Sequence, residues 1–150
     1  MRVTFDTNVL VYSLNKRDPN HSAAVALLQH ATYENSVQPM QIYGEFFHVV
    51  TRKYAYPADD TIAAIEKFRA IMSSTVADET DFGEALQTAA RYRVQFWDAL
   101  IWATARRVGS RVILTEDLPG ISSLDGLTFV NPFDPANRDL IDLALPPLNP

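Results

Sequence analysis

The sequence contains no cysteine. Disulfide bonds and thiolate metal sites are therefore excluded, and any metal ion has to be bound by oxygen or imidazole ligands. A chain built without disulfides is suited to a reducing compartment, so we expect a cytoplasmic protein.

Long apolar runs are also missing. No uninterrupted stretch reaches the roughly 18–20 apolar residues that a membrane-spanning helix needs. Polar residues follow Met1 too soon for the apolar core of a secretory signal. We expect neither a membrane span nor a signal peptide.

Positive charge is in short supply, since 13 lysines and arginines face 18 aspartates and glutamates, for a net charge of −5. Taken alone, this balance disfavours a nucleic-acid partner. Several basic residues nevertheless fall in three tight groups: Arg52 and Lys53, Arg91 and Arg93, and Arg106 and Arg107 with Arg111. Such groups either hold phosphates or form ordinary solvated surface, and the sequence leaves both open.

The 150 residues are enough for one domain with its own core. Periodicity and turn residues predict strands at 2–5, 35–39, 111–115 and 127–130, and helices at about 22–31, 41–54, 59–72, 81–93 and 97–108. Residues 7–18 are expected to begin as a helical turn and continue as a loop, and 74–77 to be a strand or merely extended. Strands separated by helices predict an α/β fold: a central parallel sheet of four to five short strands, flanked by helices.

The composition changes near the end of the chain, where proline, aspartate and asparagine accumulate. We therefore expect one domain over residues 1–133 and a C-terminal tail over 134–150. One short helix is possible in the tail, near 138–144.

Acidic residues follow two of the predicted strands. Asp6 comes directly after the strand 2–5, and Glu116 and Asp117 follow the strand 111–115. Ligands of open α/β sheets bind beyond the carboxyl ends of the strands. If these two strands are neighbours, their carboxylates lie side by side.

Two further acids lie on predicted helices with apolar faces. At 100° per residue, Glu45 lies at the rim of the apolar stripe of its helix, and Asp98 falls within an almost wholly apolar surface. A carboxylate that faces a core is costly unless a metal ion, an arginine or a helix cap compensates it.

Each acid also has a structural explanation: a helix cap for Asp6, a helix dipole for Asp98, an ion pair with Arg52 for Glu45, and a turn before Pro119 for Asp117. Their joint occurrence favours a common site. Four oxygen ligands without cysteine or paired histidine favour Mg²⁺ or Mn²⁺ over Zn²⁺. The three histidines are not spaced as a metal pair, and we interpret them as structural or surface residues.

Several stretches together resemble the PIN domain, and most closely the ribonuclease toxins of VapC type from toxin–antitoxin pairs. The matching segments are Phe-Asp-Thr-Asn-Val-Leu (5–10), Gly-Glu-Phe-Phe-His-Val-Val-Thr-Arg-Lys (44–53), Phe-Trp-Asp-Ala-Leu-Ile-Trp-Ala-Thr-Ala (96–105), Leu-Thr-Glu-Asp-Leu-Pro-Gly (114–120) and Phe-Val-Asn-Pro-Phe (129–133). The resemblance spans about residues 2–133.

The resemblance implies a three-layer PIN-like fold and an acidic quartet at Asp6, Glu45, Asp98 and Asp117 that binds Mg²⁺ or Mn²⁺ and hydrolyses RNA. Four neighbouring residues are expected in support: Thr7, Asn8, Thr115 and Glu116, the last of which contributes to or substitutes in the quartet. A homodimer and inhibition by a cognate antitoxin are also implied. The basic groups at 52–53 or 91–93 would hold phosphates, and bases could stack on aromatic residues such as Tyr12, Tyr43, Phe96 and Trp97.

Three other functions fit parts of the pattern. A haloacid-dehalogenase-like phosphatase needs a second acid two residues after Asp6, where this chain has Asn8. A receiver-like signalling domain needs an acid pair at the first strand, which is missing. A PIN-like module that binds RNA or protein without catalysis is the remaining alternative, and the intact quartet argues against it.

Overall fold

The structure is a computed structural model that describes residues 1–148. Its strands are β1 (Arg2–Phe5), β2 (Val37–Pro39), β3 (Ser73–Thr75), β4 (Ser110–Leu114), β5 (Ser123–Leu124) and β6 (Leu127–Val130). Its helices are α1 (Thr7–Leu14), α2 (His21–Gln29), α3 (Met40–Lys53), α4 (Ala58–Ile71), α5 (Glu79–Tyr92), α6 (Phe96–Arg107), the 3-10 turn η1 (Pro135–Asn137) and α7 (Arg138–Ala144).

The main sheet has the strand order β1-β4-β6-β5, in which β1, β4 and β6 are parallel. This confirms the predicted α/β class with a mostly parallel sheet of short strands flanked by helices. The short β5 was not predicted, and it runs antiparallel to β6. Asp125 and Gly126, both with positive φ, form the tight turn between these two strands, as Asp-Gly pairs commonly do in hairpins.

A second, two-stranded sheet pairs β2 with β3 in parallel, and it is linked to β1 largely by side chains. The fully buried Gln38 accepts a hydrogen bond from the Phe5 N–H at 2.7 Å and donates one to the Phe5 carbonyl at 2.8 Å. The Thr4 hydroxyl donates to the Val37 carbonyl at 2.8 Å. The Gln38 amide thus makes the two hydrogen bonds that the backbone of a neighbouring strand would otherwise make to the end of β1, just before Asp6.

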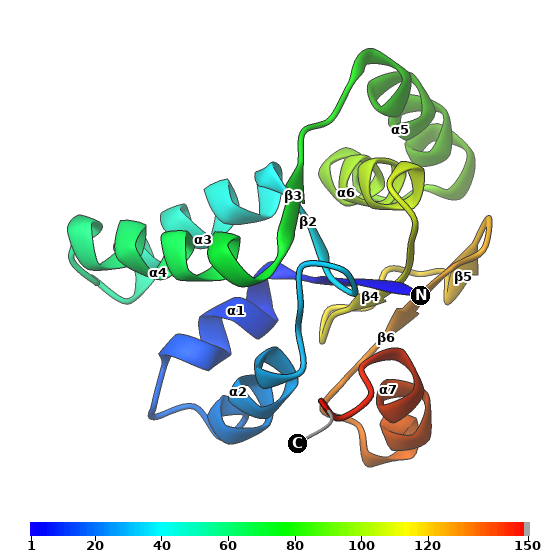
Figure 1. Cartoon of the computed structure of the whole chain (residues 1–150). Helices are drawn as coiled ribbons and strands as arrows, with labels where there is room; N and C mark the ends of the chain where they lie inside the picture. The colour runs from blue at the N-terminus through cyan, green and yellow to red at the C-terminus, as the bar shows by residue number, and fades with distance from the viewer. Residues whose placement is uncertain (149–150) are drawn as a thin grey trace.

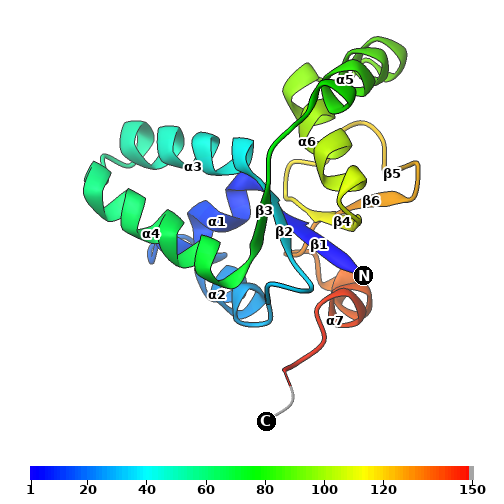
Figure 2. The same cartoon turned by 45° about the horizontal axis from the view of Figure 1, so that its top comes forward.

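Helices cover both faces of the sheet. Figure 1 shows α5 and α6 on one side and α1, α2 and α7 on the other, while α3 and α4 lie beside β2 and β3. The same grouping is visible in Figure 2, where α3 runs next to α4 and α5 next to α6. This is the expected three-layer arrangement. None of the described helices is long and apolar enough to cross a lipid bilayer.

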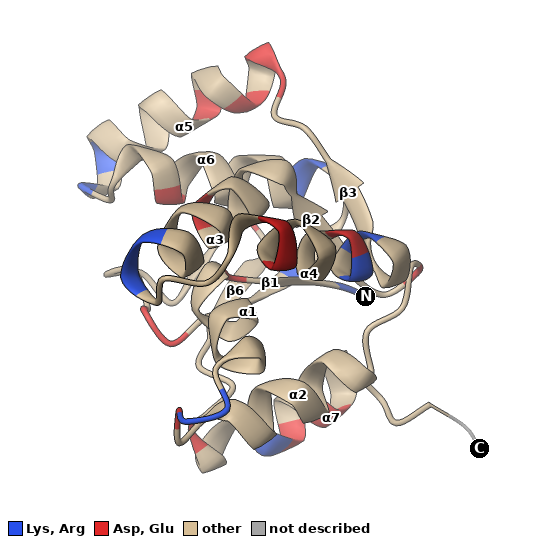
Figure 3. Ribbon diagram, turned by 90° about the vertical axis from the view of Figure 1, so that its left-hand side faces the viewer, with Lys and Arg blue, Asp and Glu red and all other residues tan. Residues whose placement is uncertain are grey.

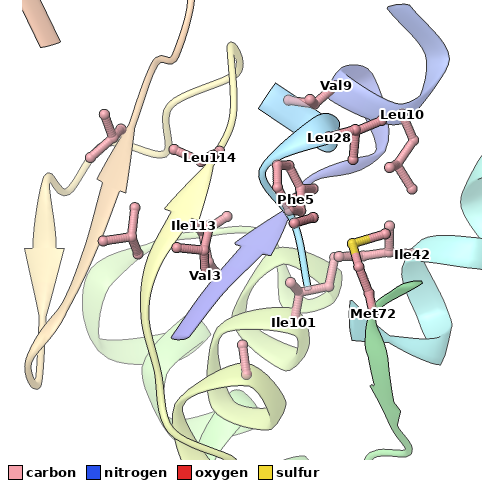
Figure 4. Close-up of a cluster of buried hydrophobic side chains, with 14 of the residues drawn as sticks. Val3, Phe5, Val9, Leu10, Leu28, Ile42, Met72, Ile101, Ile113 and Leu114 are labelled. Atoms are coloured by element: carbon pink, nitrogen blue, oxygen red, sulfur yellow. The ribbon is translucent and has the colours of Figure 1, made fainter. Parts of the chain in front are cut away.

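The core lies between these layers. Figure 4 shows side chains of β1 and β4 packed with residues of α1, α3 and α6, including Phe5, Leu10, Ile42, Ile101 and Leu114. All five are almost completely buried. The packing fixes the ends of β1 and β4 relative to the helices that bear Glu45 and Asp98.

Two segments differ from expectation. Residues 7–14 form a continuous helix rather than one turn and a loop, because Val9, Leu10 and Val11 are buried against the core. The possible helix near 138–144 is present as α7. Ile141, Ala144 and Leu145 are buried in the main core, so this part of the expected tail packs on the domain.

Candidate functional site

The site begins at the carboxyl ends of two neighbouring strands. Phe5 of β1 pairs with Leu114 of β4, and the Asp6 N–H donates to the Leu114 carbonyl at 2.9 Å. The two strand ends therefore meet, as expected if the strands are neighbours. Asp6 also caps α1, since its Oδ1 accepts from the Thr7 N–H at 2.7 Å. The Asp6 carboxylate can therefore cap α1 and belong to the site at the same time.

Thr115 joins the two strand ends through its hydroxyl. This buried group donates to Asp6 Oδ2 at 2.7 Å and accepts from Asn8 Nδ2 and from the Asp117 N–H, both at 3.1 Å. Asn8 in turn accepts from the Glu116 N–H at 3.2 Å. Three of the expected supporting residues, Thr7, Asn8 and Thr115, therefore contact the acids or the segment that carries them.

Glu45 approaches from α3 and is held at both oxygens. Thr7 Oγ1 donates to its Oε2 at 2.9 Å, and Gln41 Nε2 donates to its Oε1 at 3.0 Å. The suggested ion pair with Arg52 does not form. Gln41 was missed by sequence reasoning, although it lies one helical turn before Glu45, a spacing at which side chains meet. Its Nε2 also donates to the Trp97 carbonyl at 3.2 Å, which ties α3 to α6.

Asp98 and Asp117 complete the acidic group from two further elements. Asp98 lies in the first turn of α6, where the helix dipole also favours an acid, and it is exposed rather than enclosed by the apolar face. Asp117 is exposed in the loop after β4. All four carboxylates line one cavity of about 940 Å³, together with Thr7 and Asn8.

Burial and mutual repulsion disfavour the charged forms of two of these acids. Burial raises the pKa of Asp6, the hydrogen bonds from Thr115 and Thr7 oppose this, and the charges of Glu45 and Asp98 raise it further. Partial burial of the carboxyl group also raises the pKa of Asp98, and the charges of Glu45 and Asp117 add to this. The four acids thus form one electrostatically coupled group that a cation would stabilise.

The donor set suits a hard, hydrated cation. Within residues 1–148, no three acidic or histidine side chains already converge as direct ligands of one ion. Mg²⁺ normally keeps several of its waters and takes only one or two carboxylates directly. An open group of carboxylate oxygens around a cavity fits that mode of binding, whereas it does not fit the closed tetrahedral sites of structural zinc.

Other candidates divide between the cavity and the rest of the fold. Glu116 is exposed and accepts a short hydrogen bond from the Tyr12 hydroxyl, and Glu116 is not among the residues that line the cavity. Tyr12, Trp97, His48 and Lys53 do line it. The remaining aromatic and basic candidates lie elsewhere: Tyr43, Phe96, Arg52, Arg91 and Arg93.

Solved structures with a similar fold include a toxin and a toxin–antitoxin complex. The chain resembles the sarcin–ricin-loop-cleaving toxin VapC20 of Mycobacterium tuberculosis at a TM-score of 0.66, with 18% identity over 77% of this chain and 89% of that one. It resembles a toxin–antitoxin complex of Klebsiella pneumoniae at a TM-score of 0.68, with 19% identity over 88% of this chain and 98% of that one. FitAcB of Neisseria gonorrhoeae gives a TM-score of 0.66, with 18% identity over 87% and 98% of the two chains.

At these identities the structural likeness establishes the fold. No curated protein sequence matches the chain significantly. The family model described as PIN domain, in contrast, matches residues 3–119, a range that includes Asp6, Glu45, Asp98 and Asp117. The chain therefore belongs to the PIN domain family.

Proposed function

We propose that this protein is a metal-dependent endoribonuclease toxin of VapC type, with Asp6, Glu45, Asp98 and Asp117 as its catalytic residues. The observation that carries the proposal is the gathering of four carboxylates, from the ends of β1 and β4 and from α3 and α6, around one cavity. Burial and the neighbouring carboxylates raise the pKa of Asp6 and of Asp98, and this supports the proposal because a bound cation would offset that repulsion. Family membership supports nuclease chemistry at this place.

The residues have distinct roles in the proposed reaction. Asp6, Asp98 and Asp117 would hold Mg²⁺ or Mn²⁺, and Glu45 would be a further ligand, directly or through a water. A bound ion would supply activation of a water nucleophile and charge neutralisation at the scissile phosphate. Thr115 keeps Asp6 in place, and Thr7 holds Glu45 from the side of α1. Asn8 fixes the loop after β4 by accepting from the Glu116 N–H, and the Glu116 carboxylate, in the same loop, is an outer acid bonded to Tyr12.

The test is cleavage of total cellular RNA by purified protein in Mg²⁺ or Mn²⁺. We expect discrete products that disappear with EDTA and in Asp98→Asn. Asp142→Asn is the matched control, because Asp142 is an exposed acid on α7 whose only ion pair within residues 1–148 is a long one to Arg138 at 3.9 Å. Cleavage that persists in Asp98→Asn, or that is lost equally in Asp142→Asn, would count against the assigned site.

A second candidate function is a PIN-like module that binds RNA or protein without cleaving it. In the described part of the chain no three acidic or histidine side chains converge as direct ligands of one ion, and this alternative needs no such convergence. Folded, antitoxin-free protein that binds RNA in EDTA and cleaves no RNA in either metal would establish this alternative in place of the nuclease.

We further propose that the protein acts in the cytoplasm, as a homodimer that a cognate antitoxin inhibits. The similar chains include toxin–antitoxin complexes, which supports the antitoxin. Co-expression with the product of a neighbouring short reading frame should yield a complex without RNase activity. Sedimentation of the isolated protein as a monomer at high concentration would refute the dimer.

A further inference from the structure

The cavity with the four carboxylates continues as a groove between α1 and α3. A second hollow of about 500 Å³ adjoins the cavity, since Val11 and Tyr54 line both. We propose that this groove holds the single-stranded RNA next to the scissile phosphate, with phosphates on its cations and bases on its tyrosines. The inference rests on the proposed nuclease function and specifies the path of its substrate.

The wall formed by α3 leads from the carboxylates to a cation. Glu45, Val49 and Lys53 line the cavity and follow one another at intervals of four residues, which places them on one helix face; His48 lines the cavity beside them. The axial rise from Glu45 to Lys53 is about 12 Å. A strand whose scissile phosphate lies at the acids would therefore extend its neighbouring nucleotides along this wall.

Lys16 and Arg17, in the loop after α1, line the second hollow, close to the end of the wall where Lys53 lies. In Figure 3, blue segments mark the end of α3 and the loop that follows α1. Among the described residues, Lys16, Arg17 and Lys53 have no carboxylate partner within 4.0 Å. The nearby Asp18 accepts instead from the Asn20 N–H at 2.8 Å.

Helix dipoles alone give a plainer explanation, because each of these cations follows or ends a helix. The helix dipoles explain why cations lie at helix ends. They do not explain why two helix ends bring their cations to the same groove, or why this groove opens onto an acidic site. The chain has a net charge of −5, so cations without carboxylate partners in this groove are notable. They suit a polyanion whose reacting phosphate lies at the four carboxylates, at the opposite end of the groove.

Two tyrosines make the groove suitable for unstacked bases. Tyr54 and Tyr56 line the second hollow and are 37% and 39% exposed, and Lys53 Nζ lies over the Tyr54 ring, 5.7 Å from its centroid. Ala55 between them adopts a positive φ of 51°, and the Tyr56 N–H donates to the Val50 carbonyl at 3.1 Å, which fixes the turn. Cations that follow a backbone, combined with exposed aromatic rings, are the recurring features of single-strand binding.

The lining favours RNA over an apolar peptide helix. Besides the two tyrosines and the two cations of the loop, the second hollow has Asn15 and only three aliphatic residues: Val11, Leu14 and Val50. A helix docked through its apolar face needs a continuous hydrophobic groove. A protein partner in this groove is therefore the competing outcome of the test.

The experiment measures binding of a short fluorescein-labelled single-stranded oligouridylate by anisotropy over a series of salt concentrations. All proteins carry Asp98→Asn and are kept in Mg²⁺, so that the probe is bound without being cut. The variants are Lys53→Gln and the pair Lys16→Gln with Arg17→Gln. Arg138→Gln is the matched control, because it removes one exposed positive charge from α7.

We expect the slope of log affinity against log salt to fall by about 0.7 for each cation that contacts a phosphate of a single strand. Lys53→Gln should thus lower it by about 0.7, the pair by about 1.4, and Arg138→Gln not at all. Tyr54→Leu with Tyr56→Leu should weaken binding roughly 30-fold or more at every salt concentration and leave the slope unchanged, since stacking is not ionic.

RNA binding with the same slope in the groove variants and the control would overturn the inference. If those variants keep the slope but lose an antitoxin that the control still binds, the groove belongs to a protein partner. The nuclease proposal fails separately. If the slopes fall as expected in the Asp98→Asn background, but the protein with Asp98 intact cleaves no RNA, the groove inference stands and the nuclease proposal is refuted. A protein that binds no RNA in any condition refutes both.

Discussion

Replacing Asp98 by asparagine should stabilise the metal-free protein and, at the same time, reduce its response to metal. The pKa of Asp98 is raised above its usual value of 3.8 by partial burial and by the charges of Glu45 and Asp117. A raised carboxyl pKa means that the native state binds the proton more tightly than the unfolded state. Stability is therefore lost as the pH rises from 3.8 through the raised pKa, and the charged form is a net cost at neutral pH.

The expected gain is small, because Asp98 is exposed and solvent screens the repulsion. Like-charge contacts at such positions cost about 0.2–1 kcal/mol each, and the dipole of α6 returns about 0.3–1 kcal/mol. With two repelling neighbours and partial burial against one dipole, we expect a net gain of about 0.5 kcal/mol for Asp98→Asn. In a domain of this size that is about 1–2 °C in Tm.

Metal should reverse the order of the two proteins. An ion at ten times its Kd stabilises the native state by about 1.4 kcal/mol, which is about 3–6 °C in the wild-type Tm. Asp98→Asn lacks one ligand and should gain much less. Thermal unfolding followed by circular dichroism measures the Tm of each of the two proteins in EDTA and in Mg²⁺ or Mn²⁺.

Asp60→Asn provides a matched control. Asp60 is also exposed and also in the first turn of its helix, α4, but it is not part of the acidic group. There the dipole acts without the repulsion, so asparagine should lower the Tm slightly, with or without metal. A fall in Tm for Asp98→Asn in EDTA, equal to that of Asp60→Asn, would show that the carboxylates do not repel one another and would refute the reasoning.

Three other substitutions test the framework around the acids. Thr115→Val removes a buried hydroxyl that donates to Asp6 and accepts from Asn8 and the Asp117 N–H. It should cost about 1–3 kcal/mol in urea unfolding, whereas Thr115→Ser should cost far less. Gln41→Leu removes the hydrogen bond to one oxygen of Glu45. Titration calorimetry should show that Mn²⁺ binding weakens by roughly 10-fold or more, while the Tm in EDTA changes little. An unchanged Kd would exclude this positioning role. Gln38→Leu leaves the N–H and carbonyl of Phe5 without partners and should cost about 2–4 kcal/mol, so a loss below about 0.5 kcal/mol would mean that water replaces the amide.

The sequence by itself determined the elements with strong local signals. Val112, Ile113 and Leu114 form a short apolar run that is buried in β4, and the apolar run of α6 ends before Gly109, which adopts a positive φ. The acids at the ends of β1 and β4 were predicted to lie side by side if these strands are neighbours, because parallel strands bring their carboxyl ends to one edge, and β1 does pair with β4. The family resemblance, which rests on local motifs, was likewise readable from the chain and is confirmed.

Only the tertiary structure decided which partner each polar side chain takes. Gln38 as a substitute strand partner, Gln41 as the link from Glu45 to α6, and the groove between α1 and α3 all depend on contacts between residues far apart in the sequence. The second turn of α1 and the packing of α7 are of the same kind. Their local sequences allow either helix or loop, and burial against the core selects the helix because it removes apolar side chains from water.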